Sequence, residues 1–198
     1  MSHPRKVIAQ VNVSIDGYSA GTPDDGMGGM AFLQEHASHE QMSTYFEGVW
    51  RGADTAVMGR TNYEGFHGFW PSVVTSPDAS PRDRELAMWL DTVEKVVFST
   101  TLEKAEWQNA RVAKQDLETE IRELKNAPGR DILVLNSASV IRALIAADLL
   151  DELRIAVLPA ILGGGLRLFD GNPAYSTWRL GGACTLTTGA VVLHYVRP

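Results

Sequence analysis

Glycine, arginine and threonine follow one short apolar run of the chain in a pattern that suits phosphate binding. Gly59, Arg60 and Thr61 come directly after residues 54–58 and precede a stretch with helical spacing. A glycine lets the backbone approach a ligand closely, and a helix N-terminus offers free N–H groups to an anion. An arginine can donate two parallel hydrogen bonds to a phosphate. The alternative interpretation is an ordinary strand-to-helix turn with a surface arginine.

Small hydroxyl-bearing residues follow two further apolar runs, at 94–98 and 131–135. The candidate residues are Ser99, Thr100, Ser137, Ala138 and Ser139. Their hydroxyl groups can hydrogen-bond a phosphate or a ribose, and small side chains before a helix let a pyrophosphate reach its N–H groups. The same residues can equally close a turn or cap a helix.

Three consecutive glycines, Gly163, Gly164 and Gly165, form the most unusual stretch of the chain. Such a run loses much conformational entropy on folding, so we expect a geometric need for it, and glycine runs can form anion-binding concavities. A bare flexible turn is the alternative. The sequence contains neither GxGxxG nor GxxxxGK[ST], which disfavours an ordinary Rossmann domain and a P-loop kinase or ATPase.

The elements around these segments predict one α/β domain over residues 1–198. Apolar, β-branched runs predict strands at 6–13, 54–58, 94–99, 131–135 and 152–158. Apolar residues at helical spacing predict helices at 38–50, 61–66, 82–90, 116–126 and from 137 or 139 to 149. Residues 16–30 and 71–81 are predicted loops, and alternation at 184–188 and 190–197 predicts a terminal hairpin.

Alternating strands and helices predict a mostly parallel sheet with helices on both faces. The expected fold class is therefore α/β: a three-layer α/β/α sandwich whose mostly parallel mixed sheet is closed by a C-terminal antiparallel hairpin. Open α/β sheets bind ligands outside the carboxyl ends of their strands. Every candidate segment above follows a predicted strand, so we expect all of them at that edge.

Composition narrows the range of partners. The net charge is −6 and no Lys/Arg cluster is present, which disfavours nucleic acid. No apolar run approaches the ~18 residues that span a membrane, so no membrane partner is expected. His36 and Glu40 have i,i+4 spacing, but no third histidine stands at a metal-binding spacing, so we predict no metal site. The one cysteine, Cys184, fits a reducing compartment, and we expect a cytoplasmic protein.

Several motifs, taken in order, resemble the dihydrofolate reductase superfamily. They are Ser14-Ile15-Asp16-Gly17, Val57–Thr61, Val97–Leu102, Leu150–Leu153, Pro159, Leu162–Gly165 and Leu168-Phe169. The chain is most similar to the branch containing the C-terminal reductase domain of the bifunctional riboflavin-biosynthesis protein. No zinc deaminase signature (H-x-E…P-C-x-x-C) is present, so we expect a stand-alone reductase module.

The resemblance implies that NADPH binds at the carboxyl ends of the strands. By position it assigns Gly59, Arg60 and Thr61 to the phosphates, Arg60, Ser99 and Thr100 to the 2′-phosphate, and Ser137, Ala138 and Ser139 to the pyrophosphate. It also assigns Ile15, Asp16 and Gly17 to the nicotinamide and Gly163, Gly164 and Gly165 to the cofactor cleft. Many members carry paired glycines where this chain has Asn136-Ser137, a departure that alters how the pyrophosphate would be held.

The implied function is NADPH-dependent reduction of a small pterin-, pyrimidine- or flavin-like heterocycle. Dihydrofolate reductases carry a carboxylate on the helix before the Met-Gly-Arg motif, and the matching place here is near Ser43. Glu40 and Glu47 lie about one helical turn away, which disfavours folate reduction itself.

The proton donor stays open among Asp16, Glu47 and a bound water, and we name Asp16 and Glu47 as candidate catalytic residues. A non-catalytic dinucleotide- or flavin-binding module is the alternative to a reductase. The terminal hairpin and its apolar edge predict a homodimer.

Overall fold

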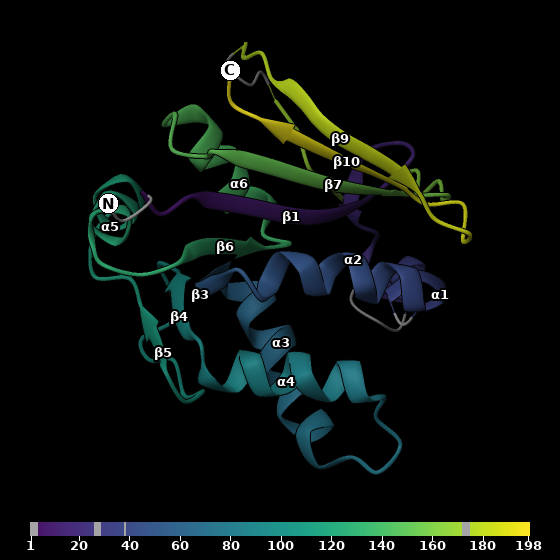
Figure 1. Ribbon diagram of the computed structural model, residues 1–198, viewed down its shortest axis with the longest axis horizontal. Coiled ribbons are helices and arrows are strands. Elements are labelled where there is room, and N and C mark those ends of the chain that lie inside the picture. The colour runs from purple at the N-terminus through teal and green to yellow at the C-terminus, as the bar shows by residue number, and fades with distance from the viewer. Residues whose placement is uncertain (1–3, 26–28, 38, 172–174) are drawn as a thin grey trace.

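A mixed sheet forms the centre of the protein in the computed structural model, which describes residues 4–25, 29–37, 39–171 and 175–198 (Figure 1). Its strands are β1 (Val7–Ser14), β3 (Ala53–Gly59), β4 (Glu94–Phe98), β5 (Ala110–Val112), β6 (Asp131–Leu135), β7 (Glu152–Leu158), β9 (Arg179–Thr185) and β10 (Val191–Val196). The spatial order is β5-β4-β3-β6-β1-β7-β10-β9. The first six of these strands run parallel, and β10 is antiparallel to both β7 and β9.

Helices cover both faces of this sheet. They are α1 (Gln34–Ala37), α2 (Glu40–Trp50), α3 (Arg60–Thr75), α4 (Pro81–Thr92), α5 (Leu117–Asn126) and α6 (Ala138–Ala146), with 3-10 turns at Pro23–Asp25 and Ala31–Leu33. Trp50 of α2, Tyr63 of α3 and Leu90 of α4 share one core cluster with Met58 of β3. Helices α5 and α6 pack into a separate cluster, so the predicted three-layer α/β/α sandwich is confirmed.

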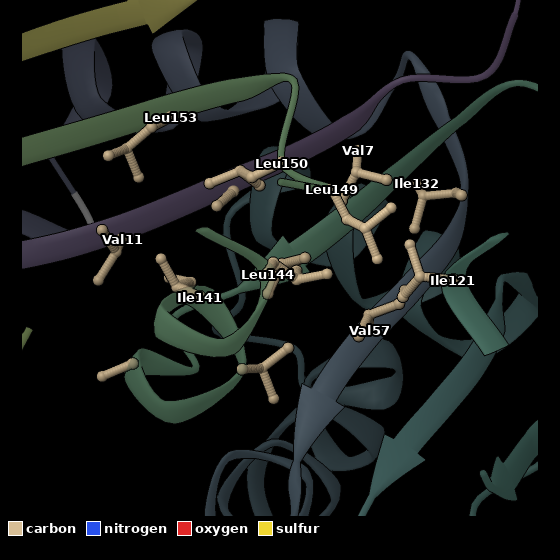
Figure 2. Packing of buried hydrophobic residues seen from close by; sticks show 14 of the residues in the cluster. Val7, Val11, Val57, Ile121, Ile132, Ile141, Leu144, Leu149, Leu150 and Leu153 are labelled. Atoms are coloured by element: carbon tan, nitrogen blue, oxygen red, sulfur yellow. The ribbon is translucent and has the colours of Figure 1, made fainter. Parts of the chain in front are cut away.

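The layer formed by α5 and α6 is held by fully buried aliphatic side chains. Figure 2 shows Ile141 and Leu144 of α6 and Ile121 packed with Val7 of β1 and Val57 of β3. All five side chains are completely excluded from solvent. Burial of one such side chain contributes about 1.5–3 kcal/mol, so this cluster holds α6 firmly against the sheet.

The structure corrects several predicted boundaries. Helix α3 does not stop at Phe66 but continues through Pro71 to Thr75, so only the second half of the predicted 71–81 loop is irregular. A proline inside a helix removes one backbone hydrogen bond and costs about 3 kcal/mol. The buried Tyr63 and Val73, near the two ends of the helix, supply packing that outweighs this local preference.

Short strands were missed where they lack periodicity. The predicted 16–30 loop contains β2 (Tyr18–Ala20), which pairs with β8 (Leu166–Arg167), and residues 26–28 of that loop lie outside the described part. The terminal hairpin is confirmed, but β9 begins at Arg179 rather than at 184. Helix α2 begins at Glu40, with His39 as its N-cap; residue 38, the predicted start, is not described.

Among the residues that the structure describes, no helix combines the length and the apolar character needed to cross a bilayer.

Candidate functional site

The candidate residues gather at one edge of the sheet, because the parallel strands β4, β3, β6, β1 and β7 are neighbours in that order and end on the same side. Ser99 and Thr100 follow β4, Gly59, Arg60 and Thr61 end β3 and open α3, and Ser137, Ala138 and Ser139 follow β6. Ile15, Asp16 and Gly17 follow β1, and Gly163, Gly164 and Gly165 lie beyond β7. The site predicted segment by segment is thus one continuous strip of backbone and side chains.

The N-termini of α3 and α6 are joined at this edge by the hydroxyl of Ser137. Its Oγ accepts a hydrogen bond from the backbone N–H of Gly59 at 2.9 Å and donates one to the carbonyl of Leu135, also at 2.9 Å. A Cβ atom placed on Gly59 would lie 3.8 Å from Oγ of Ser139. The two predicted phosphate-binding segments therefore lie side by side.

Neither α3 nor α6 has a side chain that caps its first turn. Gly59 has no side chain to offer, and Ser137 stands at the N-cap of α6 but makes no capping hydrogen bond. In contrast, Ser80 caps α4 and Asp116 caps α5. Uncapped helix N-termini leave backbone N–H groups without an intrahelical partner and carry the positive end of the helix dipole. These two helices consequently present hydrogen-bond donors at the edge.

Neither the backbone conformation nor steric crowding within the described fold requires a glycine at position 59. Its φ of −80° suits any residue, and a Cβ atom there would meet nothing closer than 3.7 Å, at Val140. An alanine would fit the fold. The missing side chain instead keeps the space above the turn open, which is what close approach of a ligand requires.

Arg60, Ser99 and Thr100 make local interactions of their own. The guanidinium of Arg60 lies 3.3 Å from the carboxylate of Glu64 in an exposed i,i+4 ion pair. Oγ of Ser99 accepts from the N–H groups of Thr101 and Leu102, at 3.1 and 2.9 Å, and so closes a turn. Thr100 is exposed. Their role at a phosphate stays a prediction.

Asp16 ties the end of β1 to the glycine loop after β7. Its carboxylate accepts from the Ser14 hydroxyl at 2.6 Å and from the backbone N–H groups of Gly163 at 2.7 Å and Leu162 at 3.1 Å. The bond from Ser14, followed by those from the backbone, lowers the pKa of Asp16 to about 2. An aspartate ionised at neutral pH has no proton to give, so this geometry favours the loop-orienting role over proton donation.

Two of the three glycines, Gly163 and Gly165, have separate structural reasons. Gly163 has a φ of +68°, a left-handed conformation that glycine adopts without strain. A Cβ atom on Gly165 would lie 2.2 Å from the carbonyl oxygen of Ala20, so only glycine allows this approach to β2. Gly164 would meet only Thr22, at 3.6 Å. The backbone contact with β2 supplies the geometric need that the sequence indicated.

A cavity of about 500 Å³ lies between the sheet and helices α2, α3 and α4. Its aromatic lining consists of Phe46, Trp50, Phe66, Phe69 and Trp70. Gln10, Asn12 and Asn136 line it from the side of the sheet, Met42 lines it from α2, and Met30 lines it from the residue before the 3-10 turn at Ala31–Leu33. A concave, mostly apolar pocket with few polar groups is the usual form of a small-molecule site.

Sequence reasoning found only part of this cavity. From the sequence, the aromatic run Phe66–Trp70 could either line a substrate cleft or pack a corner, and the structure places Phe66, Phe69 and Trp70 in the cavity wall. His67 within that run does not line the cavity but stacks between Tyr63 and Trp107, with ring centroids 5.7 and 5.6 Å away. Gln10 gave no signal at all, because it stands as one polar residue within an apolar strand.

Glu47 lines the cavity from α2, together with Ser43, where the resemblance places a carboxylate. The Glu47 carboxylate lies 2.7 Å from Nε of Arg51 and 3.7 Å from Nε of Arg82. Within the described ranges, no group of three or more His, Cys, Asp or Glu side chains could hold a metal ion.

A family model described as the RibD C-terminal domain matches residues 5–192 of this chain. Among proteins with curated descriptions, the uncharacterised protein YyaP of Bacillus subtilis (strain 168) is 26% identical over 199 residues, covering 96% of this chain and 94% of its own length.

Solved structures share the fold. A protein of Shewanella sp. PV-4, named provisionally for riboflavin biosynthesis, matches with a TM-score of 0.74 and 23% identity over 98% of this chain and 99% of its own. The dihydrofolate reductase of Enterococcus faecalis, solved with NADP(H) and an inhibitor named RAB-propyl, matches with a TM-score of 0.61 and 13% identity over 100% of this chain and 99% of its own. At these identities the likeness shows a dihydrofolate-reductase-like fold.

Proposed function

The chain belongs to the RibD C-terminal domain family, and from this premise we propose that it is an NADPH-dependent reductase of a small pterin-, pyrimidine- or flavin-like heterocycle. The observation that carries the proposal is the pair of uncapped helix N-termini, joined through Ser137 and Gly59, at the sheet edge. Asn136, which precedes Ser137 in that turn, also lines the aromatic cavity. Phosphate donors and a ring-sized cavity adjoining them are what a nicotinamide-dependent reductase needs.

The residues present fit a phosphorylated dinucleotide. The first turns of α3 and α6 would donate backbone N–H groups to its phosphates, over the space that Gly59 leaves open. Arg60 would bind the 2′-phosphate. Its exposed ion pair with Glu64 contributes little to stability and exchanges easily, so the guanidinium can leave Glu64 for the phosphate. When bound, the nicotinamide supplies the hydride.

The chain's own residues would position the substrate and control its protonation. A flat heterocycle would stack among the aromatic side chains of the cavity, away from bulk water. Asp16, held ionised, would fix the loop beside the nicotinamide, and Glu47 or a bound water would relay the proton. We place this chemistry in the cytoplasm, where an exposed lone thiol such as Cys184 stays reduced.

A non-catalytic dinucleotide- or flavin-binding module is the second candidate. It is favoured by one observation: Ser43 stands where a carboxylate would be expected, and the nearby Glu47 is already paired with Arg51 and Arg82. A module of this kind would bind NADPH without turning over a substrate.

Calorimetric titration of NADPH and NADH into the purified protein tests the proposal, with Arg60→Ala as the variant. Arg122→Ala is the matched control, because Arg122 also forms an exposed i,i+4 ion pair, with Glu118 on α5. We expect tighter binding of NADPH than of NADH and a loss of about ten-fold or more in Arg60→Ala only. If neither NADPH nor NADH binds, the proposal is overturned.

Turnover separates the two candidates. NADPH oxidation is followed by absorbance with a panel of pterins, flavins and aminopyrimidines. The aminopyrimidines are tested first because the family is related to riboflavin biosynthesis. Oxidation that depends on one of these rings supports the reductase. NADPH binding without turnover on any ring supports the binding module.

A further inference from the structure

Gln10 carries a buried polar atom that the fold leaves unused. The residue lies in the middle of β1, is 3% exposed and lines the aromatic cavity. Its side-chain Oε1 is fully buried and has no hydrogen-bond partner among the residues that the structure describes. Buried side-chain oxygens are almost always hydrogen-bonded, so the unpaired oxygen of a residue that lines a cavity calls for a partner from outside the chain.

Two neighbouring acceptors are already occupied. The backbone carbonyl of Gln10 accepts from the N–H of Asn136 at 2.9 Å, as the sheet register requires. Oδ1 of Asn136 accepts from the N–H of Asn12 at 3.0 Å. The strand side of the cavity thus offers carboxamides and no carboxylate, and among these carboxamides the Gln10 oxygen is the fully buried atom without a partner in the described chain.

Among the residues that the structure describes, the acidic groups that line the cavity, Glu47, Asp78 and Asp83, all lie on its helical side. Glu47 is paired with arginines, and Asp83 accepts from the Ser80 hydroxyl at 2.8 Å. Asp78 is exposed. A ring lying against the strands would therefore meet neutral hydrogen-bonding groups, with aromatic side chains above it.

We propose that Gln10 determines substrate specificity by pairing its carboxamide with the lactam edge of a neutral planar heterocycle. A carboxamide holds a C=O acceptor and an NH₂ donor side by side, which matches the adjacent N–H and C=O of a lactam in a two-bond pair. Because it is uncharged, it gives no advantage to a protonated 2-aminopyrimidine edge, which a carboxylate would bind. This inference rests on the proposed function and names the substrate class of the same cavity.

Two probes with one ring system test this pairing. Lumazine presents lactam edges, and 2,4-diaminopteridine presents basic amidine edges. Their affinities are measured by fluorescence titration with saturating NADP⁺, at a pH where lumazine is neutral and 2,4-diaminopteridine is protonated. The wild type should favour lumazine. Gln10→Leu should lose about ten-fold or more in lumazine affinity with little change for 2,4-diaminopteridine, and Gln10→Glu should reverse the preference.

Thermal unfolding of the variants distinguishes recognition from a structural role. Because the Gln10 oxygen has no partner within the described chain, Gln10→Leu should keep or raise the unfolding temperature. Equal lumazine affinity in wild type and Gln10→Leu would overturn the inference, as would equal loss for both probes together with a lowered unfolding temperature. Failure of both probes to bind while NADPH still binds would sink this inference alone, whereas absent NADPH binding would sink the proposed function.

Discussion

Replacing Ser137 by alanine should lower stability by a predictable amount, because its hydroxyl holds two chain segments together. The substitution removes the acceptor for the Gly59 N–H, whereas the carbonyl of Leu135 keeps a second donor, Nδ2 of Asn62 at 2.6 Å. Only one group is therefore left without a partner. An unpaired, partly buried N–H costs about 1–2 kcal/mol, which lowers the unfolding temperature by about 2–8 °C in a domain of this size.

The assay is urea and thermal denaturation followed by circular dichroism, with Ser139→Ala as the control. Ser139 lies on the same turn but is exposed, so its loss should change the unfolding free energy by less than about 0.5 kcal/mol. We also expect Ser137→Ala to weaken NADPH binding, because Gly59 and the first turn of α3 lose their anchor to β6. Equal stability of Ser137→Ala and wild type would show that this hydrogen bond does not hold the two helix N-termini together.

Three further predictions follow from single features. Asp16→Asn should speed proteolytic cleavage of the loop that contains Gly163–Gly165, because the Asp16 carboxylate accepts hydrogen bonds from that loop. The pKa of Asp16 is lowered from its usual 3.8 to about 2. The wild-type loop should therefore stay protected in pepsin digests near pH 3 and lose this protection as the pH drops through about 2. Burial lowers the pKa of Lys95 in the folded protein to about 8, so the Lys95 ammonium holds its proton more tightly in the unfolded chain. The unfolding free energy of the wild type should therefore rise between pH 8 and 10, by up to about 3 kcal/mol. This rise should be absent in Lys95→Met. The homodimer predicted from the sequence would form through the exposed edge strand β9, where Leu180 is half-exposed. Light scattering should then give twice the 21.6 kDa of one chain, and a monomer at micromolar concentration would refute the dimer.

The sequence predicted the parallel strands other than β5 well, because most of them are nearly continuous apolar runs bounded by a turn signal. Strands buried on both faces show this pattern regardless of which strand pairs with which. Helix α5 was equally predictable, since Asp116 caps its start and Pro128-Gly129 follows its end. These features depend on local chemistry, which the sequence contains in full.

Features set by contacts between distant segments could not be predicted in the same way. The course of α3 past Pro71 depends on packing of Val73, and β5 exists only because it can pair with β4. The hydroxyl of Ser137 could cap its own helix or bond to another strand, and both readings use the same residue type. Only the register that places β3 beside β6 selects the second.

The two halves of the candidate site are built from different materials. The phosphate side consists of backbone N–H groups, glycines and a hydroxyl fixed by the sheet, so its geometry depends on the fold more than on particular side chains. The substrate side consists of side chains, most of them from α2, α3 and α4, with Gln10, Asn12 and Asn136 from the side of the sheet. A scaffold divided in this way can keep one cofactor while its ring specificity changes. Under the proposed function, substitutions at cavity residues such as Gln10 would change which ring is bound and leave the phosphate-binding turns in place.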